Sequence, residues 1–218
     1  MSTGYEAGGR SAQKGRTRAA LVAAARELVT SGITPTVEEA AIAASVSRTT
    51  AYRYFPNARE LLLAAHPEVD QPSMLPPDPP ADPAARLDAV VCAFMAMIVE
   101  TEAQQRTMLR LSLERDAANR GELPLRQGRA IAWIGEALDG LRGQLSDDER
   151  TTLVYALRAT IGIEALVWLT DVAGLSRGEA VELMRWSAQA LLQHALGDAP
   201  VPTRVSRPGG RGSGAGNL

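Results

Sequence analysis

Residues 45–57, with the sequence SVSRTTAYRYFPN, place many hydrogen-bond donors at close spacing. The segment holds two arginines, two tyrosines, two threonines and two serines, and it holds no acid, histidine or cysteine. A catalytic site usually needs a titratable group that can exchange a proton with the reacting atoms, and none is present here. Donors at this density suit a surface that binds phosphate groups and reads the edges of bases. The plainer alternative is an exposed polar helix with Tyr54 and Phe55 half-buried.

Capping and stop signals predict the helices that would position these donors. Thr36 with Glu39 forms a capping box at the start of one short helix, whose apolar face is Val37, Ala40, Ala41 and Ala44. After a short break, Ser47 caps the next helix, which Pro56 ends. Two short helices separated by a tight turn are typical of a helix-turn-helix.

Two further helices flank this pair in the sequence. The earlier one has an apolar stripe of Leu21, Ala24, Ala25, Leu28 and Val29, and we expect Thr17 to cap its start and Gly32 to end it. The later one begins at Asn57 with Glu60 and ends before Pro67. The sequence therefore predicts a compact helical domain over residues 17–66.

Residues 17–65 resemble the N-terminal domain of TetR-family transcriptional regulators. The resemblance is carried by the Ala-Ala of the first helix, the glycine before the second helix, the Val-Ser turn and the run TAYRYFPN. It implies a homodimer that binds a near-palindromic double-stranded DNA operator. It also implies a helical C-terminal domain that dimerises and binds a small ligand, whose binding releases the DNA and so relieves repression.

The resemblance assigns roles to individual residues, and the chemistry of their side chains suits those roles. Arg48 and Thr49 match base-facing positions, since arginine pairs with guanine and threonine contacts the thymine methyl group. The positions expected to contact the DNA backbone are Thr36, Ser47, Thr50, Tyr52, Arg53, Tyr54 and Asn57.

Three features depart from the family pattern. Ser45 stands where the family commonly has glycine in the turn, so a left-handed backbone there carries some cost. Ala58 stands where a lysine usually reaches phosphate, and Arg59 or the basic arm is the expected replacement. The fourth helix runs into a proline-rich segment, whereas in the family this helix usually transmits ligand binding to the DNA-binding domain.

The charge distribution is asymmetric along the chain. Residues 1–66 carry eight Lys/Arg and five Asp/Glu, whereas residues 67–218 carry fifteen and twenty. We expect residues 1–16 to be a flexible basic arm, and Lys14, Arg16 and Arg18 to contact the DNA minor groove. A solubilising tail without a partner is the alternative for the same composition.

The remaining chain predicts a linker, a second domain and a tail. Residues 67–83 hold seven of the thirteen prolines and read as an extended linker. Residues 84–197 are expected to form a helical bundle that binds ligand and dimerises, which makes the whole chain all-α. Residues 198–218 are rich in Pro, Gly, Arg and Ser and are expected to be disordered.

Apolar side chains within residues 84–197 are candidates for two sites. One is a pocket for an unidentified small apolar or amphipathic ligand, and the other is the dimer interface. The ligand pocket is expected to be lined by Met95, Met97, Met108, Leu111, Arg115, Trp133 and Trp168. The dimer interface is expected to include Leu157, Ile161, Leu183 and Trp186. Packing inside the monomer is the alternative explanation for each of these residues.

Other function classes find less support in the sequence. The single cysteine, Cys92, excludes an intrachain disulfide and suits a cytoplasmic protein with a buried thiol. His66 and His194 lack neighbours at metal-ligand spacing, so neither a metal, a cofactor nor catalytic residues are expected. Arg158, Glu164 and Asp171 interrupt the longest apolar stretch, so no membrane span is expected. A small helical enzyme and a helical protein-interaction domain without DNA binding are the alternatives.

Overall fold

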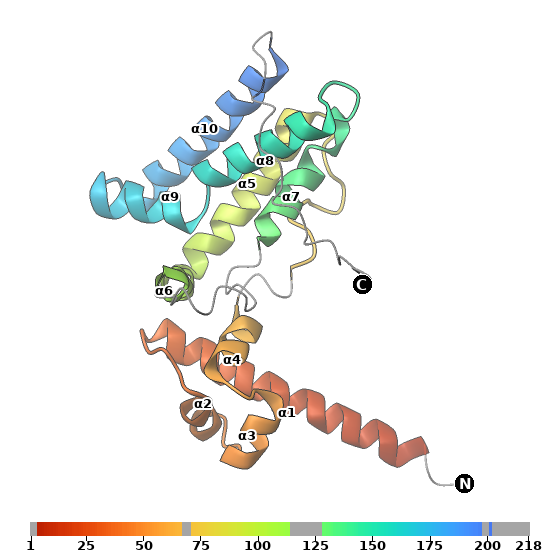
Figure 1. Cartoon of the computed structure of the whole chain (residues 1–218), viewed down its shortest axis with the longest axis vertical. Helices are drawn as coiled ribbons and strands as arrows, with labels where there is room; N and C mark the ends of the chain where they lie inside the picture. The colour runs from red at the N-terminus through yellow and green to blue at the C-terminus, as the bar shows by residue number, and fades with distance from the viewer. Residues whose placement is uncertain (1–3, 67–70, 114–127, 198–200, 202–218) are drawn as a thin grey trace, which may run out of the picture. The chain divides into compact units, whose positions relative to one another are not determined.

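A computed structural model describes residues 4–66, 71–113, 128–197 and 201, and every regular element in those ranges is helical (Figure 1). The elements in chain order are α1 (Gly4–Thr30), α2 (Val37–Ala43), α3 (Arg48–Tyr54), α4 (Ala58–Ala65), α5 (Pro83–Glu100), α6 (Glu102–Leu113), α7 (Arg129–Ala137), η3 (Asp139–Leu141), α8 (Asp147–Thr160), α9 (Ile163–Val167), η4 (Trp168–Val172) and α10 (Arg177–Leu196). The all-α expectation is therefore confirmed for the described chain.

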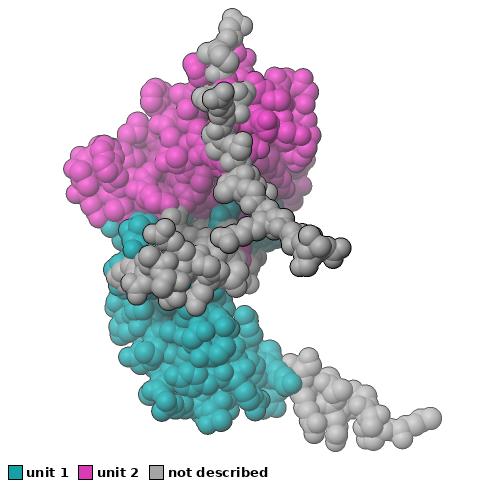
Figure 2. Space-filling view, in the orientation of Figure 1, with its two compact units in different colours: residues 1–73, 96–128 teal, residues 74–95, 129–218 magenta. Residues whose placement is uncertain are grey.

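The chain divides into two compact units whose boundaries differ from the predicted ones (Figure 2). Unit 1 comprises residues 1–73 and 96–128, and unit 2 comprises residues 74–95 and 129–218. The prediction placed residues 84–197 in one domain. The structure instead assigns α6 to the unit that contains the helix-turn-helix, because α6 packs on α1 and α4.

Unit 1 is built around one apolar cluster that joins its first four helices. Its buried members are Leu21, Val22, Ala25, Val37, Ala40, Ala41, Ala51, Phe55, Leu61 and Ala65. Alanine supplies half of these side chains, which allows the short helices to approach one another closely. The predicted stripe of the first helix and the predicted face of α2 both lie in or against buried positions, as the sequence indicated.

The start of α1 corrects the predicted arm. The helix begins at Gly4, so the expectation of a flexible segment through residue 16 with an N-cap at Thr17 is wrong. The Thr17 hydroxyl donates to the Gln13 carbonyl at 3.1 Å, a bond to the preceding turn that threonine makes inside a continuing helix. No proline interrupts the sequence before this point, and the glycines there lower helix propensity without preventing the helix.

A small second cluster attaches α6 to α1 and α4. Val29, Leu62 and Met108 form its buried core, with Leu111 packed against it. Polar contacts follow the same path, since the Gln104 amide donates to the Thr30 hydroxyl at 3.1 Å. Met108 and Leu111 are thus core residues of unit 1.

Unit 2 has its own apolar core and a bidentate ion pair between two long helices. Buried side chains come from α5, α7, α8 and α10: Leu87, Val90, Phe94, Trp133, Ile134, Leu157, Met184 and Leu192. On the half-exposed side, Arg185 Nε and Nη2 lie 3.1 and 3.0 Å from the two carboxylate oxygens of Asp88. Cys92, expected to be buried, is half-buried. Burial, followed by the nearby Asp88 carboxylate, raises the pKa of its thiol.

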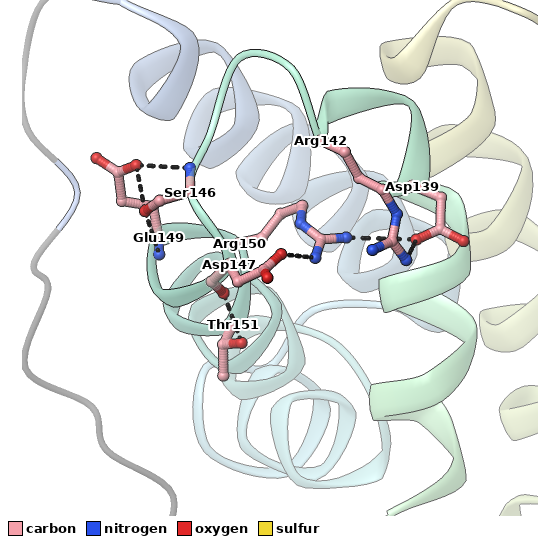
Figure 3. Close-up of polar contacts among 7 residues, drawn as sticks. All are labelled: Asp139, Arg142, Ser146, Asp147, Glu149, Arg150 and Thr151. Atoms are coloured by element: carbon pink, nitrogen blue, oxygen red, sulfur yellow. Dashed lines mark hydrogen bonds and ion pairs between the residues drawn. The ribbon is translucent and has the colours of Figure 1, made fainter.

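The start of α8 shows how polar residues define a helix end in unit 2 (Figure 3). The Ser146 hydroxyl accepts from the Glu149 backbone N–H, and the Ser146 backbone N–H donates to the Glu149 carboxylate, so the two residues form a capping box. Arg150 bridges Asp139 and Asp147 at 3.3 and 2.6 Å. These contacts join η3 to the first turn of α8.

Residues 147–172 are long and apolar enough to cross a membrane, by length and composition only. Half of the relevant window is buried inside the protein. The stretch is also broken at Gly162, where φ is 110°, and it continues as α9 and a π-helical turn, η4. It forms core helices of unit 2 in this structure.

Candidate nucleic-acid interface

The turn between α2 and α3 sets the angle at which α3 is presented. The Ser45 backbone N–H donates to the Ile42 carbonyl, and the Val46 N–H donates to the Ala41 carbonyl, at 3.0 and 2.8 Å. This pair of bonds is a Schellman motif, which requires a left-handed residue after the helix. Ser45 is this left-handed residue, with φ of 54°. A left-handed conformation was expected here, because the family commonly has glycine at this position.

α3 buries one narrow face and exposes the rest. Ala51 is its fully buried residue and Tyr54 is half-buried, whereas Arg48, Thr49, Tyr52 and Arg53 are exposed. The predicted base-facing residues and two of the predicted backbone contacts therefore share an accessible helix surface. The predicted helix boundaries, from Ser47 to the residues before Pro56, are confirmed.

Several predicted phosphate contacts also act as helix caps in this structure. The Ser47 hydroxyl donates to Thr50 Oγ1 at 2.8 Å and accepts from the Thr50 backbone N–H. Asn57 Oδ1 accepts from the Glu60 N–H at 2.9 Å. These side chains begin their helices, and they remain exposed to solvent.

Thr36 occupies a complete capping box at the start of α2. Its backbone N–H and hydroxyl both donate to the Glu39 carboxylate, at 2.8 and 2.9 Å. The backbone bond, followed by the hydroxyl bond, lowers the pKa of Glu39. The predicted capping function of Thr36 is thus confirmed.

Arg48 makes two contacts that the sequence did not reveal. Its Nε lies 2.5 Å from Glu38 Oε1 of α2. Its guanidinium carbon lies 5.7 Å from the centre of the Tyr52 ring, one turn further along α3. Glu38 was missed because Glu39 accounts for the capping signal, and only the crossing of α2 and α3 brings Glu38 to Arg48.

The basic residues near the N-terminus lie on α1. Lys14, Arg16 and Arg18 are exposed, and the Arg18 guanidinium carbon is 5.3 Å from the centre of the Phe55 ring at the end of α3. These cations therefore lie on one continuous helix and not on the flexible arm that was expected. Arg18 is the member of this set that contacts the helix-turn-helix.

The predicted ligand-pocket residues fall into different surroundings. Met95 and Trp133 are buried in unit 2, where the Trp133 ring meets Phe94 edge-to-face at 5.8 Å. Met108 and Leu111 belong to unit 1, Trp168 is 59% exposed, and Arg115 lies outside the described residues. The prediction that all of them line one pocket is wrong, because apolar spacing does not tell which helix each residue faces. Met97 is half-buried on α5.

The predicted dimer residues also separate into two groups. Leu157 and Ile161 are completely buried within unit 2, so their assignment to an interface is wrong. Leu183 and Trp186 are exposed on α10. These two residues, one turn apart on α10, and the exposed Trp168 and Val172 of η4, which packs on α10, are here called the α10 surface.

A groove of about 430 Å³ lies at the α10 surface. It is lined by Ala159, Thr160, Glu164, Ala165, Trp168, Leu169, Leu183, Met184 and Ser187. Among the residues that the structure describes, no three His, Cys, Asp or Glu side chains are placed to hold a metal ion.

The fold of this chain is similar to that of a solved protein structure. It is a TetR transcriptional regulator from Rhodococcus sp. RHA1, with a TM-score of 0.56 and 21% sequence identity. The similarity covers 83% of this chain and 98% of that chain. No family model and no curated protein matches the sequence. The likeness shows that this chain has the fold of that regulator, with an N-terminal helix-turn-helix and a helical C-terminal part.

Proposed function

We propose that this chain, which has the fold of a TetR transcriptional regulator, is a sequence-specific DNA-binding regulator and has no enzymatic activity. The observation that carries the proposal is α3 itself. It follows a tight turn, buries only one face and exposes Arg48, Thr49, Tyr52 and Arg53. The second helix of a helix-turn-helix enters the major groove with its N-terminal residues toward the bases.

The exposed residues divide into base-reading and backbone-binding groups. Arg48 and Thr49, on the first turn, are assigned to base edges. Tyr52, Arg53 and Tyr54, further along, are assigned to phosphates, together with the hydroxyl and amide groups of Thr36, Ser47, Thr50 and Asn57. Lys14, Arg16 and Arg18 on α1 add positive charge that attracts the duplex, and their number sets part of the salt dependence.

Binding to DNA tests the proposal directly. Purified protein is used to select sequences from random DNA, and binding to the selected sequence is measured by fluorescence anisotropy at two salt concentrations. We expect salt-sensitive binding and a loss of about 1–3 kcal/mol for Arg48→Ala on the preferred sequence. Arg142→Ala is the matched control, since Arg142 is an exposed arginine of unit 2 paired with Asp139. Failure to select any sequence would refute the proposal.

We further propose that the protein acts as a cytoplasmic homodimer on a near-palindromic operator. The support is the α10 surface, where two tryptophans are exposed, because exposed apolar patches often mark protein–protein interaction sites. A twofold axis through this surface would bury Trp186 against the groove of the second copy. Two recognition helices related by such an axis require two half-sites.

A small apolar or amphipathic ligand that releases the DNA, and so relieves repression, completes the proposal. Met95 and the Phe94–Trp133 pair supply an apolar environment in unit 2. The half-buried guanidinium of Arg158 lies 5.9 Å from the centre of the Phe94 ring, and it is paired with Glu164 at 3.1 Å. In thermal-shift screening, apolar and amphipathic compounds should stabilise the wild type more than Trp133→Leu. Stabilisation by highly charged metabolites alone would contradict this assignment.

A further inference from the structure

We infer that Glu38 is a positioning residue that increases the selectivity of Arg48 for guanine. This inference rests on the proposed DNA binding and on the assignment of Arg48 to a base edge. It is carried by a contact between side chains of different helices, of which Arg48 is 73% exposed and Glu38 41% exposed, and neither residue has a capping role or a place in the core.

The atoms involved decide what the contact can do. Glu38 approaches the guanidinium most closely at Nε, the nitrogen nearest to the side-chain stem. The two terminal nitrogens of Arg48 donate no hydrogen bond to any residue in the described part of the chain. These two nitrogens form one of the donor pairs with which arginine can bind guanine O6 and N7 together. Glu38 therefore contacts the side of the guanidinium that this base contact does not need.

Tyr52 restricts the same side chain from a second direction. Its ring lies beneath the guanidinium at 5.7 Å, from a position four residues later on α3. An arginine on an exposed helix otherwise samples many rotamers, and holding it costs entropy when DNA binds. Because Glu38 contacts Nε and Tyr52 lies against the face of the guanidinium, the Arg48 side chain is already partly ordered before it binds the base.

The charge of Glu38 has a second consequence for specificity. A carboxylate close to the DNA surface repels phosphate, and this repulsion acts on every sequence alike. The guanine contact offsets it only on the preferred sequence. Glu38 is therefore expected to reduce binding to non-preferred DNA while supporting the preferred site, as repulsive elements do in other specific interfaces.

The test separates positioning from simple charge. The guanine read by Arg48 is located as the base pair at which Arg48→Ala loses preference, and it is then replaced by another base or by 7-deazaguanine, which lacks the N7 acceptor. Wild-type protein should lose about five- to 150-fold in affinity when another base replaces the guanine, the equivalent of one bidentate contact, and less on 7-deazaguanine, which keeps O6. Glu38→Gln should reduce this discrimination by about two- to fivefold, as expected for an exposed ion pair.

Two other variants serve as controls. Glu27→Gln removes the same charge from an exposed position on α1 and should raise affinity slightly on all sequences without changing discrimination. Tyr52→Phe keeps the ring and should weaken all sequences alike, whereas Tyr52→Leu should also lose discrimination. Helix content is compared by circular dichroism for each variant.

The outcomes are distinct. Reduced guanine discrimination in Glu38→Gln, with none in Glu27→Gln, supports the inference. Unchanged discrimination in Glu38→Gln, with wild-type binding intact, overturns it and leaves an ordinary surface ion pair. Absence of DNA binding by the wild type overturns the proposed function itself, which is a different result.

Discussion

Ser45 offers a direct test of how the turn before α3 is maintained. It occupies the left-handed position of the Schellman motif that ends α2, with φ of 54°. Its side chain is exposed and makes no hydrogen bond within the described residues. Replacing Ser45 with glycine therefore removes the conformational cost of the left-handed backbone and breaks no side-chain hydrogen bond within the described residues.

The expected size of the effect follows from two opposing contributions. Left-handed backbone costs a residue with a Cβ about 1–2 kcal/mol. Glycine avoids this cost but loses more freedom on folding, by roughly 0.5–1 kcal/mol. Ser45→Gly should therefore stabilise the α2–α3 region by about 0.5–1 kcal/mol.

Hydrogen exchange measured by mass spectrometry reports this region separately from unit 2. Peptides spanning residues 36–55 should exchange about two- to fivefold more slowly in Ser45→Gly, provided that exchange follows local opening. Peptides from α8 provide the internal reference. DNA affinity should rise by no more than the same factor, since the turn only positions α3.

Gly32→Ala is the matched control at the end of α1, where the Gly32 N–H donates to the Val29 carbonyl and the Ile33 N–H to the Leu28 carbonyl in a second Schellman motif. Gly32 follows α1 with φ of 82°, and a Cβ placed there meets no atom within 4 Å. Its substitution should accelerate exchange at the end of α1 for conformational reasons alone. If Gly32→Ala shows this loss and Ser45→Gly shows no gain, the assigned cost of Ser45 is refuted.

Three further predictions concern unit 2. Trp186→Glu should convert a dimer to a monomer in size-exclusion chromatography with light scattering, whereas Ile131→Glu, at an exposed apolar residue of α7, should not; a dimeric Trp186→Glu would contradict the α10 surface as the interface. Arg185→Lys should lower the free energy of unfolding by up to about 1 kcal/mol in chemical denaturation, because lysine cannot make the two-point contact with Asp88, and Arg142→Lys should change it less. The Ser146 hydroxyl, followed by its backbone N–H, lowers the pKa of Glu149 below its ordinary value of 4.5, so this stabilisation is present above that value and is lost as pH falls through the lower folded pKa. Glu149→Gln should therefore reduce the acid sensitivity of the melting temperature, and an equal effect from the neighbouring Asp148→Asn would argue against the capping box as its cause.

Local signals predicted most elements of unit 1 correctly. The caps at Thr36, Ser47 and Asn57, and the left-handed position at Ser45, depend on residues three or four apart. Such interactions form within one turn and can be read from the sequence. The start of α1 was missed because the Thr17 hydroxyl can cap a new helix or bond to the preceding turn, and the sequence does not distinguish these two bonds.

These local signals did not predict the contacts between helices. Met108 and Met95 have similar apolar surroundings in the sequence, yet one packs on α1 and α4 and the other lies in unit 2. Leu157 and Trp186 both lie on helices with several apolar faces, and only packing decides which face is covered.

The sequence by itself determined the helical class, the order of caps and turns in residues 36–65, and the donors exposed on α3. These features follow from hydrogen bonds and apolar spacing within one or two helical turns. Tertiary structure alone decided that α6 joins unit 1, that Trp168 and Trp186 remain exposed, and that Glu38 meets Arg48. Each of these depends on which faces of separate helices meet, and that choice is made by the packing of the whole chain.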